Sequence, residues 1–143
     1  MEWRITHEEE LKDVARDILA RCTTHDTHAT VLTLSGTLGA GKTSLARALA
    51  RELGIQENIK SPTFIIESRY VLSHVQWRML VHIDAYRLES VSQLAPLHFT
   101  ETLAQPNTLV LIEWPEHIQD AIPGGVHKIT ITITDTGRLI TLS

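Results

Sequence analysis

The chain has 143 residues and a formal net charge of −4, with 13 lysines and arginines against 17 aspartates and glutamates. This length predicts a single domain, residues 1–143, with a buried core. The negative balance and the lack of a basic stripe argue against direct binding to a nucleic-acid backbone, so any RNA is expected to be held by a partner. Cys22 is the only cysteine, which excludes an intrachain disulfide, and no run approaches the roughly 20 apolar residues of a membrane span. We therefore expect a cytoplasmic protein without membrane contact.

The N-terminal segment predicts a short strand followed by a helix. Residues 3–5 have the composition of an edge strand, and Thr6-x-x-Glu9 matches a capping box at a helix N-terminus. Apolar residues then recur at helical spacing up to Leu19, so we expect the helix to end near Arg21.

The most informative stretch is residues 29–54, where an apolar, β-branched run passes into GTLGAGKT and then into a helical pattern that Gly54 ends. The spacing GxxxxGK(S/T) between a strand and a helix is typical of a phosphate-binding loop. Glycines let this glycine-rich loop (residues 36–43) turn tightly and expose N–H groups to an anion, next to a helix N-terminus. Lys42 is expected to reach the β- and γ-phosphates of a nucleotide. The Thr43 hydroxyl is expected to bind Mg²⁺.

A second motif, SPTF, occupies residues 61–64 and leads into a predicted strand over residues 64–71. Pro62 makes the entry to this strand extended and rigid, which is a way to hold Thr63 at a fixed place. The alternative is that Thr63 is an ordinary polar residue at the start of a strand.

Residues 79–84 form the next predicted strand, paired with the preceding one as a hairpin. Period-two alternation puts His82, Asp84 and Tyr86 on one side of it. If this strand neighbours the strand before the glycine-rich loop, His82 and Asp84 face the phosphates. The alternative for Asp84 is a structural interaction with Arg87 or with the backbone.

The middle of the chain predicts two short helices, or a helix and a loop, and then a buried strand. Residues 90–102 have weak helical signals that Pro96 interrupts. Residues 108–112 are a near-continuous apolar run, which is typical of a parallel strand buried on both faces. Glu113 follows directly, and a carboxylate at the end of such a strand fits the acidic residue on the Mg²⁺ side of a nucleotide site. Trp114 either lines the nucleotide pocket or a partner surface, or packs in the core.

The C-terminal residues predict an antiparallel hairpin. Residues 128–134 alternate isoleucine with threonine, residues 135–137 form a turn, and residues 139–142 return with one apolar face. Together the elements predict an α/β fold of the P-loop NTPase class. Its central, mostly parallel sheet is flanked by helices and ends in this antiparallel hairpin.

Four motifs in this order, GTLGAGKTS, SPTF, HIDAYRL and LIEWPE, closely resemble the TsaE (YjeE) family, the small P-loop ATPases of bacterial tRNA threonylcarbamoyladenosine synthesis. The resemblance covers residues 6–116. It implies ATP and Mg²⁺ as cofactors and an accessory ATPase rather than the transferase. ATP binding and hydrolysis would reset the family's two-subunit threonylcarbamoyl-transferring assembly, TsaD and TsaB, between rounds. These partners, and not this chain, would hold the tRNA.

Carried to this chain residue by residue, the resemblance implies ATP contacts at Gly36, Thr37, Leu38, Gly39, Ala40, Gly41, Lys42, Thr43 and Ser44. It places Mg²⁺ near Thr43 and Glu113. It also implies that Thr63 belongs to a switch-like loop and that Asp84 positions or activates the attacking water.

The same resemblance implies an adenine contact from the N-terminal segment, at Thr6 or Glu8. The chain departs from the family at two places. Family members usually carry an acidic residue at the position of Thr37, which affects the glycine-rich loop. They also carry a glycine-containing stretch at residues 94–97, where this chain has LAPL, and this departure affects the contact with partners.

Two other functions are compatible with a phosphate-binding loop. A small-metabolite kinase usually has an arginine-rich lid after the core, whereas the terminal hairpin contains only Arg138. A non-hydrolysing, ATP-dependent interaction module needs no water-orienting carboxylate, so Asp84 argues against it. A GTPase is disfavoured because the sequence contains no NKxD signature.

Overall fold

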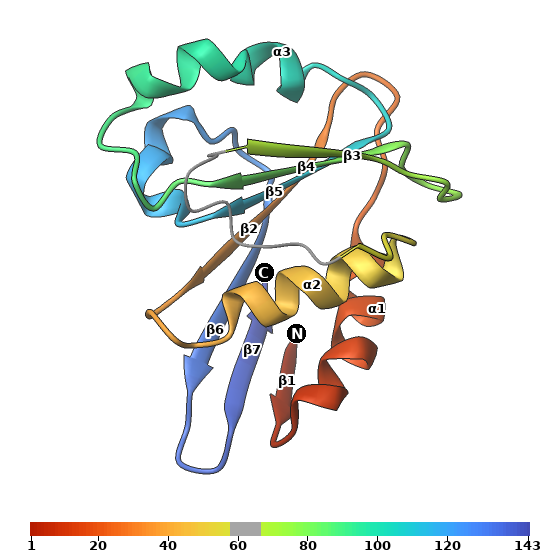
Figure 1. Cartoon of the computed structure of the whole chain (residues 1–143), viewed down its shortest axis with the longest axis vertical. Coiled ribbons are helices and arrows are strands. Elements are labelled where there is room, and N and C mark those ends of the chain that lie inside the picture. The colour runs from red at the N-terminus through yellow and green to blue at the C-terminus, as the bar shows by residue number, and fades with distance from the viewer. Residues whose placement is uncertain (58–66) are drawn as a thin grey trace.

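The computed structural model describes residues 1–57 and 67–143, and its centre is a seven-stranded sheet (Figure 1). The strands are ordered β1-β7-β6-β2-β5-β4-β3 across the sheet. Their bounds are β1 Glu2–Ile5, β2 Thr30–Gly36, β3 Glu67–Val71, β4 Met79–Asp84, β5 Thr108–Glu113, β6 His127–Ile133 and β7 Arg138–Leu142. Thr63 and the predicted start of β3 at Phe64 lie outside the described residues.

The four central strands, β6, β2, β5 and β4, run parallel, and the pairings toward both edges are antiparallel. This arrangement confirms the predicted parallel centre, the hairpin of β3 with β4 and the C-terminal hairpin of β6 with β7. It also confirms residues 3–5 as an edge strand, because β1 is the outermost strand next to β7. All residues of β5 are buried, as its apolar run predicted, since a central parallel strand has no solvent-facing side.

Two regular helices, α1 (Leu11–Arg21) and α2 (Lys42–Glu52), cover one face of the sheet (Figure 1). Their buried residues recur at the helical period and pack with alternate residues of the strands into one core cluster. Both helices end where the sequence predicts: α1 ends at Arg21, and Gly54, with a φ of 92°, follows the end of α2.

The start of α1 differs from the prediction. A 3-10 turn, η1 (Glu8–Glu10), precedes the helix. Because this extra turn moves the helix start, the carboxylate of Glu10 rather than Glu9 accepts hydrogen bonds from the backbone N–H groups of Thr6 at 3.0 Å and His7 at 2.9 Å. The predicted Thr6–Glu9 capping box is therefore wrong by one position. The two backbone bonds lower the pKa of Glu10.

Three short elements cover the opposite face of the sheet: η2 (Val91–Leu97), α3 (Phe99–Leu103) and η3 (Pro115–Ala121). Figure 1 shows α3 on the far side of the sheet from α1 and α2. The prediction of two short helices near Pro96 is confirmed, and His98, with a φ of 53°, separates them. Among the described residues, no helix is long and apolar enough to cross a membrane.

The strand order corrects one expectation. β5 lies between β2 and β4, so the strand that carries His82 and Asp84 is not the neighbour of the strand before the glycine-rich loop. The register nevertheless brings the three strand ends close together, because Glu113 pairs with Asp84 and with Leu34, two residues before the end of β2. Ligands of open α/β sheets bind beyond such carboxyl ends. Glu113, rather than Asp84, is thus the acidic residue beside β2.

Candidate functional site

The glycine-rich loop connects β2 to α2 at the carboxyl end of the sheet. Gly36 lies against β6, where a Cβ atom would be 2.8 Å from the carbonyl oxygen of Ile131. Gly41, directly before α2, has a φ of 106°, a left-handed conformation that side chains rarely adopt. The motif therefore has glycine at two positions where this backbone requires it.

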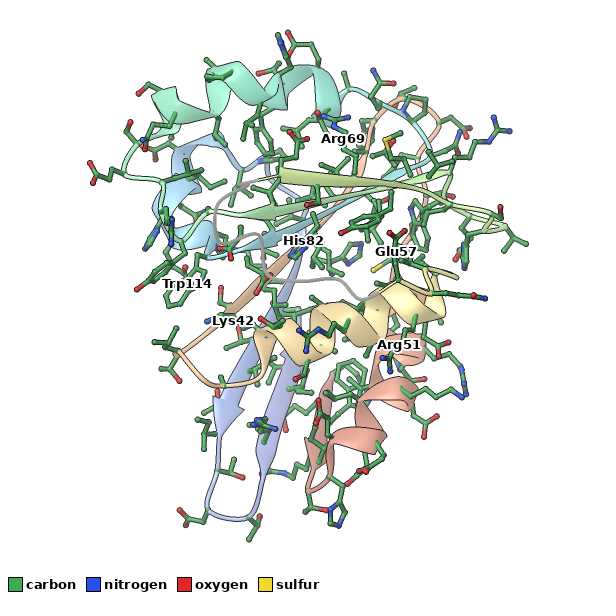
Figure 2. The ribbon with its side chains drawn as sticks, in the orientation of Figure 1. Lys42, Arg51, Glu57, Arg69, His82 and Trp114 are labelled. Carbon is green, nitrogen blue, oxygen red and sulfur yellow. The ribbon has the colours of Figure 1, made fainter. Side chains whose placement is uncertain are left out.

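Lys42 begins α2 and is buried at the base of the loop, with 6% of its surface exposed. Its Nζ donates hydrogen bonds to the backbone carbonyl oxygens of Gly36 and Thr37, the second at 3.3 Å. The same Nζ lies 3.8 Å from the centroid of the Trp114 ring, a cation–π contact. Figure 2 shows Lys42 at the N-terminal end of α2, on the side of the molecule where Trp114 lies.

Three carboxylates act on the charge of Lys42. Burial lowers the pKa of the Lys42 ammonium, and the negative charges of Glu113, Glu116 and Asp84 oppose that shift. The fold thus brings together Lys42, Asp84 and Glu113, which the sequence assigned to one site from three separate motifs.

Glu113 ends β5 and is 2% exposed. Its Oε2 accepts a hydrogen bond from His82 Nε2 at 2.6 Å, and its backbone oxygen accepts one from Ala85 N–H at 2.9 Å. Carboxylate and hydroxyl oxygens are ligands that Mg²⁺ prefers. The described residues contain no group of three His, Cys, Asp or Glu side chains that could hold a metal ion by themselves. A cation here would therefore need phosphate, hydroxyl or water oxygens in addition to Glu113, which is the usual arrangement for Mg²⁺ with a nucleotide.

Asp84 ends β4, one strand further from the glycine-rich loop, and is half-buried. Its Oδ1 accepts a hydrogen bond from the backbone N–H of Tyr86 at 3.0 Å. The backbone interaction that was the alternative reading is therefore present. The negative charge of Asp84 still acts to raise the pKa of Lys42. The proposed role of Asp84 in positioning the attacking water stays a prediction.

The other residues predicted to contact ATP differ in their exposure. Thr43 and Ser44 are half-buried in the first turn of α2, and Ala40 is buried. The exposed residues of the loop are Thr37, Leu38 and Gly39.

The N-terminal segment borders two cavities. Glu8 is exposed and lines a groove of about 880 Å³ together with Ser44 and Arg51 of α2. Thr6 lines a smaller cavity of about 240 Å³ together with Arg138. The two residues proposed for the adenine contact thus lie in different cavities, and the structure does not bring them to one place.

Arg138, the first residue of β7, packs against the glycine-rich loop. A Cβ atom on Gly41 would be 3.2 Å from Arg138 Nε. This Nε is buried and has no hydrogen-bond partner within residues 1–57 and 67–143. Sequence reasoning missed the contact because it depends on where the β6–β7 hairpin lies, and no local pattern reports that.

Aromatic rings cluster beside Lys42. The ring centroids are 5.0 Å apart for Tyr86 and Trp114, 5.7 Å for Trp114 and His117, and 6.1 Å for Tyr86 and His117. Trp114 has a φ of 59°, which turns the chain sharply after β5. Trp114 therefore lies at the candidate site, in contact with Lys42, rather than only in the core.

Residues 5–140 match the family model described as threonylcarbamoyl adenosine biosynthesis protein TsaE. The tRNA threonylcarbamoyladenosine biosynthesis protein TsaE of Haemophilus influenzae is 33% identical over 118 residues, which are 82% of this chain and 72% of that protein. The protein of the same name from Bacillus subtilis is 34% identical over 123 residues, 86% of this chain and 72% of that protein.

A solved structure gives the same result. The crystal structure of Bacillus subtilis YdiB superposes with a TM-score of 0.73 at 31% identity, covering 99% of this chain and 83% of that one. The fold, the order of the four motifs and these matches agree. The chain belongs to the TsaE family of tRNA threonylcarbamoyladenosine biosynthesis proteins.

Proposed function

We propose that this protein binds and hydrolyses ATP with Mg²⁺ and, as an accessory ATPase, supports threonylcarbamoyladenosine modification of tRNA. One observation carries the proposal. The glycine-rich loop, the buried Lys42 and the buried Glu113 meet at the carboxyl ends of two adjacent parallel strands, β2 and β5. A buried cation at a helix N-terminus and a buried carboxylate that acts on its charge suit a phosphate–metal pair.

The phosphates would lie on the glycine-rich loop and the first turn of α2. Lys42 Nζ now binds the carbonyl oxygens of Gly36 and Thr37, two neutral acceptors. Phosphate oxygens are stronger acceptors for an ammonium group, because the hydrogen bond is then charge-assisted on both sides. Lys42 would exchange its bonds to the loop for bonds to the β- and γ-phosphates.

Thr43 and Glu113 would hold the magnesium ion. When bound, Mg²⁺ neutralises part of the charge on the phosphates. Glu113 supplies a carboxylate from the sheet, and Thr43 supplies a hydroxyl from the first turn of α2. Their places, at the start of α2 and at the end of the strand beside β2, support this division.

Asp84 would orient the attacking water, and Thr63 would act with it from the segment outside the described residues. For the base, the cavity shared by Thr6 and Arg138 is the better candidate, because Arg138 also packs against Gly41 of the loop. Glu8 lines the separate groove beside α2, which Ser44, another residue predicted to contact ATP, also lines, so an adenine contact at Glu8 stays the alternative.

The partners would be the TsaD- and TsaB-type subunits of the threonylcarbamoyl transferase. The names of the relatives refer to threonylcarbamoyladenosine biosynthesis in tRNA, and the net charge of −4 argues against direct binding of the tRNA backbone by this chain. tRNA would reach this cytoplasmic protein only through those subunits.

Calorimetry with MgATP and steady-state ATPase assays, with and without the transferase subunits, test the proposal. We expect saturable binding and a turnover of ~10⁻⁴ to 10⁻² per second for the chain alone, and acceleration by the subunits. Binding without hydrolysis under any condition would favour the interaction module. Phosphoryl transfer to a small metabolite would favour the kinase. A turnover of ~1 per second, unaffected by partners, would contradict the accessory role.

A further inference from the structure

His82 lies on β4 and is buried in the interior. Its Nε2 is 2.6 Å from Oε2 of Glu113, and the two side chains are 1% and 3% exposed. Figure 2 shows His82 between the sheet and α2, on the same face of the sheet as Lys42. The imidazole therefore reaches the Glu113 carboxylate from the neighbouring strand.

The contact leaves the carboxylate little freedom. Oε2 accepts the hydrogen bond from His82, and the backbone carbonyl of the same residue is bound by Ala85 N–H. Rotation of the Glu113 side chain would break the bond to His82 and leave two buried polar groups without this partner. The second oxygen, Oε1, is thus held in one orientation near the end of β2, because Glu113 pairs with Leu34, two residues before that end.

We infer that His82 is a positioning residue for Glu113: it fixes one carboxylate oxygen so that the other is preoriented for the metal of a bound nucleotide. This inference rests on the proposed Mg²⁺-dependent ATP site. Hydrogen-bonded neighbours of metal ligands act in this way in many metal sites, and their loss typically weakens metal affinity about 10- to 100-fold.

The alternative is that the pair only packs the core. A buried polar pair is a poor choice for that purpose, since apolar residues of similar volume are often equally or more stabilising. The Nδ1 atom of His82 is also buried, with no hydrogen-bond partner among the described residues, which adds a desolvation cost. Such a cost at the end of two strands that carry Glu113 and Asp84 is better explained by the site.

His82 and Asp84 would then have separate tasks on one strand. They are two residues apart and lie on the same side of β4, but His82 is buried and bonded to Glu113 whereas Asp84 is half-buried and bonded to Tyr86 N–H. His82 acts on the metal side through Glu113. Asp84 remains the residue that reaches the water.

Two substitutions separate positioning from packing. His82→Gln places an amide N–H close to the position of the histidine Nε2, whereas His82→Asn is too short to reach Glu113. ATP affinity is measured by calorimetry with and without Mg²⁺. We expect His82→Asn to reduce the gain in affinity from Mg²⁺ about tenfold, with metal-free affinity unchanged, and His82→Gln to retain most of the gain. His74→Asn, the same change at a residue that precedes β4, is the control, and its gain in affinity from Mg²⁺ should match that of the natural chain.

A double variant tests whether His82 acts through Glu113. His82→Asn added to Glu113→Gln should cause no further loss of Mg²⁺ dependence, and independent, additive losses would overturn the inference. If the ATP affinity of the natural chain does not change with Mg²⁺, both the proposed function and the positioning role of His82 are overturned. Normal Mg²⁺ dependence in the natural chain and in folded His82→Asn would overturn the positioning role alone. Should His82→Asn not fold, His82→Leu, which fills similar space but has no hydrogen-bond donor, takes its place, and normal Mg²⁺ dependence in folded His82→Leu would overturn the positioning role.

Discussion

The ends of β2 and β5 are adjacent in the sheet but are built in opposite ways. β2 leaves through the glycine-rich loop, whose conformation is set by backbone: a close approach of Gly36 to β6 and a left-handed Gly41. β5 leaves through Trp114, a non-glycine residue with a φ of 59°, and its last side chain is held by a hydrogen bond from another strand. The backbone after β2 depends on glycines, which have no side chain, whereas the end of β5 depends on side-chain contacts.

This difference separates what each strand end supplies. The end of β2 presents a cation and backbone N–H groups, which recognise phosphate largely through main-chain geometry. The end of β5 presents an oriented carboxylate, whose position depends on β4. Substitutions at the end of β2 should therefore change ATP affinity with or without Mg²⁺, whereas substitutions at the end of β5 should change the gain in affinity from Mg²⁺.

Asp84→Asn tests whether the end of β4 contributes only to chemistry. The amide oxygen can still accept the Tyr86 N–H bond, so the fold is kept while the charge is removed. We expect hydrolysis to fall by roughly 10²- to 10⁴-fold and ATP affinity to change by no more than a few-fold, because the carboxylate is proposed to act on water in the transition state. Asp13→Asn, on the exposed side of α1, is the control in the same ATPase assay. A collapse of affinity with normal turnover of bound ATP would make Asp84 structural.

Lys42→Ala tests the β2 side. Removing the buried ammonium should weaken ATP binding about 100-fold, with or without Mg²⁺, since a hydrogen bond to a charged group contributes about 1.5–3 kcal/mol. Calorimetry gives the affinity, and Lys128→Ala at the start of β6 controls for loss of one positive charge. Unchanged affinity would mean that the loop is not the nucleotide site.

Glu113→Gln tests the end of β5, and unlike Lys42→Ala it should change the Mg²⁺ dependence of ATP binding rather than the metal-free affinity. The amide keeps the shape but not the charge, so metal-free ATP affinity should persist while the gain from Mg²⁺ falls about 10- to 50-fold. The measurement is a Mg²⁺ titration at fixed ATP. A curve identical to that of the natural chain would assign Glu113 to packing and remove the contrast between the two strand ends.

Local patterns predicted most of the fold. The apolar periods of α1 and α2, the glycine-rich loop between β2 and α2 and the apolar run of β5 were predictable because each depends on neighbours in the sequence. The strand order was not, since β5 inserts between β2 and β4 through pairings that no local pattern specifies. Because of this order, Asp84 lies one strand further from the glycine-rich loop than expected, and Glu113 lies on the strand next to β2.

The candidate site was predictable to the same extent. Lys42 was predictable from the glycine-rich loop between a strand and a helix, and Glu113 from its place at the end of a buried strand. In the structure the charge of Glu113 acts on Lys42. The hydrogen bond from His82 to Glu113, the contact of Arg138 with Gly41 and the ring of Trp114 over Lys42 join segments far apart in the chain. Each depends on side-chain packing across strands, which composition and spacing do not report.

Cys22 gives the smallest effect, in a region away from both strand ends. The thiol follows α1 and is buried, and burial raises its pKa from 9.0 to about 11. Because the folded state keeps the neutral thiol, this contribution to stability is complete below pH 9 and is lost as the pH rises from 9 through about 11. At pH 10 the natural chain should have lost about 1 kcal/mol of unfolding free energy relative to pH 8, beyond any loss in Cys22→Ala. Denaturant unfolding at the two pH values measures it, and parallel pH dependences in both chains would show that the thiol does not contribute.

The complete burial of β5 also determines how the site behaves over time. Its residues are hydrogen-bonded to parallel strands on both sides and covered on both faces, so its amide hydrogens exchange with solvent only when most of the domain opens. Glu113 belongs to β5, the strand expected to unfold last, whereas Thr37 and Leu38 lie exposed on the glycine-rich loop. The metal side of the site would keep its geometry through the local fluctuations of an empty protein, and nucleotide binding would chiefly slow hydrogen exchange in the glycine-rich loop.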